Sequence, residues 1–86
     1  MAVLATYIVG EEVNEGAYCR IDSIYGGKYL NGWTAQATAW RREFNGPDVA
    51  LVRIANFAVS VPYVEDAIPY QQLYIQMKSE LNGEDC

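Results

Sequence analysis

The chain of 86 residues contains no histidine and only two cysteines. The absence of histidine removes the commonest general base and metal ligand. No serine or cysteine lies in a nucleophile motif, no cysteine pair has zinc spacing, and the glycines match no phosphate-binding pattern. The sequence therefore predicts a protein that is not an enzyme and has no catalytic residue, metal site or cofactor.

Long hydrophobic runs and excess positive charge are also missing. No apolar stretch approaches the roughly 20 residues that a membrane-spanning helix needs. The opening stretch, MAVLATYIVGEE, lacks the positive charge and the cleavage site of a signal peptide. Six basic and eleven acidic residues give a net charge of -5. Because nucleic acid is bound by Lys and Arg that neutralise its phosphates, we expect neither nucleic acid nor a membrane as a partner.

The two cysteines are too few for a disulfide framework. Cys19 lies in a strand-like segment and Cys86 is the last residue. We expect Cys19 to be a small buried side chain and Cys86 to be a terminal thiol. A bridge between them is an open alternative.

Short strand-like segments fill the first two thirds of the chain. Alternating or β-branched apolar residues predict strands over residues 2–9, 17–25, 33–44 and 49–61. Paired turn residues predict a loop or a short extra hairpin at 26–33. The apolar phase of the last strand changes near Ala55 and Asn56, which predicts a β-bulge there or a bend between two short strands.

The closing stretch, YVEDAIPYQQLYIQMKSELNGEDC, has the one clear helical pattern. Pro69 suits a first helical turn and Asn82-Gly83 suits a stop, so we expect a helix over residues 69–81. Spacings of three and four place five large side chains on one face of this helix: Tyr70, Leu73, Tyr74, Met77 and Leu81. Ala35, Ala37 and Ala39 on one face of the third strand leave room for them.

These elements predict an α+β domain, an antiparallel β-meander of four to five strands with one C-terminal helix packed on one face. At 86 residues the chain is one domain with a single small core. One helix cannot cover both faces, so we expect the second face of the sheet to stay open.

Aromatic residues are more numerous than so small a core can bury: seven Tyr, two Trp and two Phe. Tyr, Trp and Arg are enriched where proteins meet. We expect an interface on the open face and in the adjoining loop, made by Tyr18, Tyr25, Tyr29, Trp33, Trp40 and Arg42. The alternative is a minor hydrophobic cluster under a long loop. Of the adjacent Arg41 and Arg42, we expect one to be in solvent and one to pair with a carboxylate.

The layout of the chain resembles a family of small tailed-bacteriophage proteins of about this length. AYCRIDSI at 17–24 is similar to a strand of that family, AYxRI, and LYIQMKSE at 73–80 is similar to its terminal Y..LK helix. Members of the family are regarded as virion structural or tail-associated components, with no catalytic residues to carry over.

The resemblance implies a non-enzymatic structural subunit of a bacteriophage virion, made in the host cytoplasm and associated with the tail or baseplate. It would assemble through sheet-face and edge contacts, with other virion proteins as partners or as a homo-oligomer. An acidic composition without an active site also fits an alternative from another class, a small acidic monomeric inhibitor or anti-host interaction protein.

Overall fold

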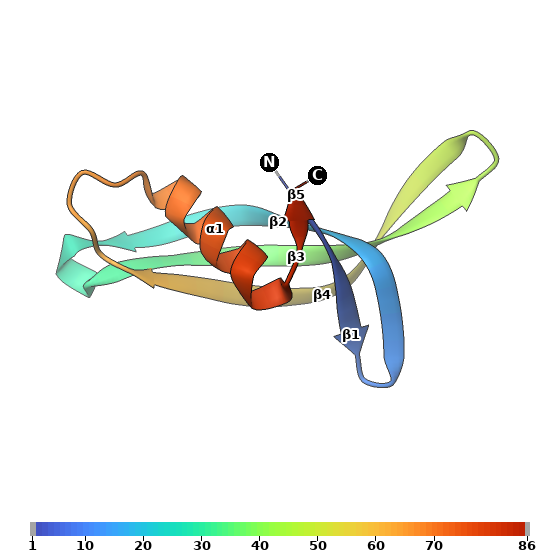
Figure 1. Ribbon diagram of the computed structural model, residues 1–86, viewed down its shortest axis with the longest axis horizontal. Helices are drawn as coiled ribbons and strands as arrows, with labels where there is room; N and C mark the ends of the chain where they lie inside the picture. The colour runs from blue at the N-terminus through green and yellow to red at the C-terminus, as the bar shows by residue number, and fades with distance from the viewer. Residues whose placement is uncertain (1, 86) are drawn as a thin grey trace.

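The computed structural model describes residues 2–85 as one sheet with a single α-helix packed on it (Figure 1). The strands are β1 (Val3–Val9), β2 (Glu12–Gly27), β3 (Gly32–Asn45), β4 (Asp48–Pro62) and β5 (Glu84–Asp85), and the helix is α1 (Pro69–Leu81). A 3-10 turn, η1 (Lys28–Leu30), separates β2 from β3. The predicted α+β meander with a C-terminal helix is confirmed, and the helix has the expected bounds.

All neighbouring strands are antiparallel, in the order β4-β3-β2-β1-β5. The first four follow sequence order, as in a meander. β5 returns from the end of α1 and pairs with β1, with Asp85 opposite Val3. Gly83 permits this close return, because a Cβ at that position would collide with the side chain of Val3. At one edge of the sheet, β5 therefore pairs with Val3 and Leu4 of β1, and the other edge is β4.

The core lies between α1 and one face of the sheet. Leu73 and Met77 are fully buried, and Tyr74 is 8% exposed. They cover small side chains of the sheet, namely Ala5, Ala17, Cys19, Ala35, Ala37 and Ala39. Because these side chains are small, the large helical residues fill the space above them, as their volumes predict. On the predicted helix face, Leu81 also packs against this core, and Tyr70 is half-buried.

Tyr74 and Asp85 connect α1 to the first and last strands. The Tyr74 hydroxyl donates to the carbonyl oxygen of Ala2 at 2.5 Å and lies 2.9 Å from Oδ1 of Asp85. Lys78 Nζ lies 3.1 Å from Oδ2 of the same carboxylate. The hydrogen bond from Lys78, followed by the one from Tyr74, lowers the pKa of Asp85 below its ordinary value of 3.8. These contacts fix the short strand β5 against the end of the helix.

Cys19 is a free, fully buried thiol, as the sequence predicts. Burial raises its pKa to about 11, so the thiol is neutral at physiological pH. Cys86 and the suggested bridge lie outside the described residues.

The second strand begins earlier than predicted. Residues 12–16 belong to β2 rather than to a wide turn, because Val13 and Asn14 pair with Ile8 and Tyr7. Asn14 is buried, and its side-chain amide donates to the carbonyl oxygen of Tyr7 at 3.2 Å. Asn14, a residue type common in turns, therefore links β1 to β2 through its side chain.

Register shifts occur at Ala5/Tyr7, Ile21/Ser23 and Ala39/Trp40. The last of these leaves Ile54 as the extra residue of β4, next to Ala55, so the predicted bulge is confirmed. A bulge bends its strand and increases the local twist. The first and last bulges lie where the sheet divides into two hairpins that project in different directions (Figure 1).

We call residues 7–16 the β1–β2 arm and residues 41–53 the β3–β4 arm. The β3–β4 arm ends in a two-residue loop between Asn45 and Asp48. Gly46 in this loop has φ 64°, which such a turn requires and glycine adopts without strain. The arms make the molecule elongated, 47 by 27 by 19 Å. Its radius of gyration is 14.1 Å, against about 12 Å for a compact domain of this length.

Candidate functional site

The most distinctive local feature is the fork at which β2 and β3 separate. Tyr18 and Trp40 form the last pair of β2 and β3 before the arms diverge. Leu4 lies beside Tyr18, and Arg53 lies beside Trp40, so the row crosses four strands. Successive strand residues point to opposite faces, and the neighbours of this row are core residues, so the row lies on the face away from α1.

Two arginines at the base of the β3–β4 arm contact the β1–β2 arm. Arg41 lies 3.0 Å from Glu12 and 2.6 Å from Glu43, and these contacts, that with Glu43 first, raise its pKa. Arg42 is exposed, and its Nε donates to the carbonyl oxygen of Gly16 at 3.1 Å. The expectation that one arginine pairs with a carboxylate and the other is in solvent is confirmed. Such exposed contacts stabilise little, but they hold the arms at a defined spacing.

Both arms expose large apolar side chains. Those on the β1–β2 arm are Ile8, Val9 and Val13, and those on the β3–β4 arm are Phe44, Val49 and Leu51, with exposed fractions between 37% and 68%. Ile8 lies opposite Val13 and Phe44 lies opposite Val49, so the apolar residues form cross-strand pairs. A two-stranded ribbon buries little surface by itself. Each arm therefore presents apolar area to solvent.

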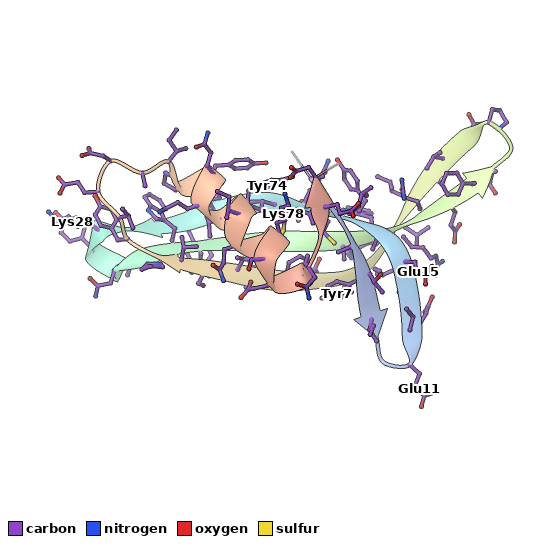
Figure 2. The ribbon with its side chains drawn as sticks, in the orientation of Figure 1. Tyr7, Glu11, Glu15, Lys28, Tyr74 and Lys78 are labelled. Atoms are coloured by element: carbon purple, nitrogen blue, oxygen red, sulfur yellow. The ribbon has the colours of Figure 1, made fainter. Side chains whose placement is uncertain are left out.

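Acidic residues accompany the apolar ones on the β1–β2 arm. Glu11 lies at the tip and Glu15 lies along the side, and both are exposed (Figure 2). Glu12, next to the tip, pairs with Arg41 at the base of the β3–β4 arm. The two arms therefore differ in character, since the β3–β4 arm carries the arginines and the larger apolar residues.

The structure divides the six residues predicted for an interface. Tyr18, Trp40 and Arg42 come together at the fork. Tyr25 lies at the other end of β2 and Tyr29 lies in η1, with exposed fractions of 52% and 99%.

Trp33 does not share the open face. It lies on the helix side of β3 and packs against the core, because its side chain has the same orientation as Ala35 two residues later. The prediction of one shared surface is therefore wrong for Trp33. For the other five residues, the role in an interface stays a prediction.

The arm residues were missed by sequence reasoning, although a signal for them exists. Once Gly46 and Pro47 are taken as a two-residue loop, the register is fixed. It then places Phe44 opposite Val49 with no helix pattern nearby to cover them. A symmetric apolar pair beside a tight turn indicates an exposed hairpin arm.

The open face also carries polar contacts between strands. Thr38 is 5% exposed, and its hydroxyl is hydrogen-bonded to the carboxylate of Asp22 and lies 3.2 Å from Oδ1 of Asn56. The hydroxyl oxygens of Thr34 and Ser60 lie 3.1 Å apart. The indole N–H of Trp40 is buried without a hydrogen-bond partner among the described residues. Away from the fork, these contacts between strands on the open face are therefore polar.

Within residues 2–85, no group of three His, Cys, Asp or Glu side chains is placed to hold a metal ion. A surface depression of about 540 Å³ adjoins the last turn of α1, lined by Ile75, Lys78, Ser79, Asn82 and Gly83. Its ionisable side chain, Lys78, pairs with Asp85. None of the helices in the described part of the chain has the length and apolar character required to span a membrane.

No protein-family model matches the chain, and no curated protein or solved structure shows significant similarity to it.

Proposed function

We propose that the protein is a non-enzymatic structural subunit of a bacteriophage virion, associated with the tail or baseplate, that uses its two arms to contact neighbouring proteins. The observation that carries this proposal is the pair of projecting hairpins with exposed apolar side chains. The arms contain about a quarter of the described residues but six of the twelve large hydrophobic side chains that are exposed.

The surface area supports an assembly role. The accessible surface is 5701 Å², whereas a compact protein of this mass exposes about 5100 Å². Burying the apolar side chains of the arms would stabilise an assembly by roughly 25 cal/mol for each Å² removed from water. Neighbouring subunits are the natural source of that cover in a particle.

The assignment to a virion is supported by the resemblance of residues 17–24 and 73–80 to small tailed-phage proteins. An assembly subunit needs no active site, only surfaces that fit its neighbours. The partners would be other virion proteins or further copies of this chain, and the protein would be made in the host cytoplasm before assembly.

The first experiment combines light scattering with variants of one arm. Phe44→Ser with Leu51→Ser removes two exposed apolar side chains from the β3–β4 arm. We expect this double variant to form smaller oligomers, or to bind isolated tail or baseplate proteins at least tenfold more weakly, with an unchanged circular dichroism spectrum. The matched control is Leu30→Ser with Val64→Ser, because both side chains are exposed but lie at the other end of the sheet and outside the predicted interface.

The second experiment concerns the particle. The protein should be detected by mass spectrometry in purified virions of the phage that encodes it. Absence from virions, together with an arm variant that behaves like the control, would contradict the proposal.

A second candidate function is a small acidic monomeric inhibitor or anti-host interaction protein. It is favoured by the exposed Glu11 and Glu15 on the β1–β2 arm, which could imitate an acidic ligand (Figure 2). The same light-scattering measurement separates the two, since this alternative requires a monomer at every concentration and binding to a host protein that Glu11→Lys with Glu15→Lys abolishes.

A further inference from the structure

The two edges of the sheet differ in how they are paired. The first two residues of β1 pair with β5, but β4 is a strand of 15 residues, and no strand in the described part of the chain lies beside its outer edge (Figure 1). An uncovered edge presents a row of unpaired backbone N–H and C=O groups, which can accept a strand from another chain.

The backbone groups that point outward can be identified from the ladder. The N–H of Tyr63 donates to the carbonyl oxygen of Asn31 at 3.1 Å, so the backbone of Tyr63 points toward β3. The direction of the backbone N–H and C=O groups alternates from one residue to the next along an antiparallel strand. Between the bulge at Ile54 and the end of β4, the outward residues are therefore Asn56, Ala58, Ser60 and Pro62.

Three of these residues form an unprotected window. Asn56, Ala58 and Ser60 are exposed and small, and each has a free outward N–H in this register. Exposed edges are usually protected by charges, proline or bulges. Here the bulge at Ile54 and the proline at Pro62 lie on either side of the window rather than within it.

We propose that two copies of the protein pair through this window, β4 against β4 in antiparallel orientation, with Ala58 on the two-fold axis. The window is centred on Ala58, so a two-fold axis there uses all of it. Asn56 of one copy then lies opposite Ser60 of the other, and Ala58 lies opposite Ala58. Three such pairs exchange about six backbone hydrogen bonds.

The side chains fit this register on both faces. Asn56 and Ser60 are polar residues on the open face, where cross-strand polar pairs are favourable. On the helix side, Phe57 of one copy lies opposite Val59 of the other, which is 2% exposed and already packed in its own core. No charged side chain faces a like charge inside the window.

Charge also favours a second copy at this position. Each copy carries a net charge of -5, so two copies repel each other over most of their surface. No charged residue occurs between Arg53 and Glu65, so β4 offers a long neutral stretch at which they can approach. A two-fold contact uses the same window of both copies, so pairing of this kind stops at two copies. The inference rests on the proposed assembly function and specifies its first contact.

Ala58→Pro tests the hydrogen bonds directly. Proline removes an N–H that points away from β3, so the ladder within one chain is kept. We expect the mass from light scattering to fall by half relative to the wild type, with an unchanged circular dichroism spectrum. The matched control, Ala58→Ser, keeps both the N–H and the small size and should leave the mass unchanged. An Ala58→Pro protein with the wild-type mass would overturn the proposal.

Cross-linking tests the register and remains decisive if the proline variant fails to fold. In a background with Cys86→Ser, Ala58→Cys should form a disulfide-linked dimer under mild oxidation. The two Cα atoms would be about 5.5 Å apart, within the roughly 4.4–6.8 Å that a disulfide accepts. Ser60→Cys is the control, because its two copies would be about 14 Å apart in this register. Equal cross-linking at both positions would overturn the proposed pairing.

The outcomes for the edge and for the arms are distinguishable. If Ala58→Pro has no effect but the Phe44 and Leu51 double variant weakens assembly, the edge pairing is wrong and the proposed function stands. If neither variant changes assembly, both proposals fail.

Discussion

The half of the sheet under α1 and the two arms are built from the same strands but bury their residues very differently. Under the helix, Leu73 and Met77 are fully enclosed by small sheet residues. In the arms, Phe44 and Ile8 expose 68% and 62% of their surface. The strands run continuously from one region into the other, so the difference arises from what covers them.

One chain can thus use one region for the burial that drives folding and another region to expose apolar side chains. Ala35, Ala37 and Ala39 of β3, which we call the alanine floor, lie below α1. The helix and the alanine floor supply the burial that drives folding. The bulges at the bases of the arms turn the same strands away from the helix, so their apolar residues gain nothing from it. Substitutions in the two regions should consequently affect different measurements.

The largest expected effect is from Leu73→Ala under the helix. Removing a fully buried leucine side chain should lower the free energy of unfolding by about 2 to 5 kcal/mol. The control on the same helix is Ile75→Ala, since Ile75 is 65% exposed, and it should change stability by less than about 0.5 kcal/mol. Urea unfolding measures both. Equal losses at the two positions would break the distinction between covered and exposed residues.

Enlarging a floor residue should have the next largest effect. Ala37 is 1% exposed, so Ala37→Leu should overpack the space below α1 and cost about 1 to 3 kcal/mol. The matched control is Ala50→Leu, because Ala50 is exposed in the β3–β4 arm. Thermal unfolding of the two variants compares the regions by the same substitution. A destabilised Ala50→Leu with an unchanged Ala37→Leu would reverse the comparison.

Removing the Tyr74 hydroxyl should have a smaller effect. Tyr74→Phe keeps the buried ring but deletes the donor to the Ala2 carbonyl oxygen, which should cost about 1 kcal/mol. Amide hydrogen exchange should increase in β1 and β5 and stay unchanged in the β3–β4 arm. Uniformly faster exchange along the chain would show that the hydroxyl supports the whole fold instead.

The smallest expected effect is on the stability of the fold at low pH. Because the folded-state pKa of Asp85 lies below its ordinary value of 3.8, the carboxylate stabilises the fold above that pH. Its contribution is lost as the pH falls from 3.8 through the lower folded pKa. Asp85→Asn should thus be less stable than wild type at neutral pH, with a difference that shrinks in acid. A difference that is independent of pH would contradict the role of the charge.

Much of the helix-covered half could be predicted from the sequence. Pro69 and Asn82-Gly83 mark the helix ends with residues of restricted or unusual backbone preference, and the change of apolar phase near Ala55 marks the bulge. The alanines of β3 indicate the face that receives the helix. Each of these features is local, so the order of residues is enough to identify it.

The arms and the closing strand could not be predicted in the same way. Gly10, Asn14 and Gly16 are typical turn residues, yet Asn14 is buried between paired strands. β5 contains only Glu84 and Asp85, and no hydrophobic pattern distinguishes such a strand. Where the arms separate depends on bulges in strands far apart in sequence. For the candidate site, sequence reasoning found Tyr18, Trp40 and Arg42 but not the apolar pairs of the arms.

The order of the elements has a consequence for synthesis. β1, β2 and β3 each pair with the next strand in the chain, so these hairpins can form as the polypeptide leaves the ribosome. The alanine floor nevertheless has no cover until α1, which is translated after all four strands, has emerged. A nascent chain that stalls in the linker after β4 would expose a bare apolar face and an open edge together, and we expect such chains to require chaperones.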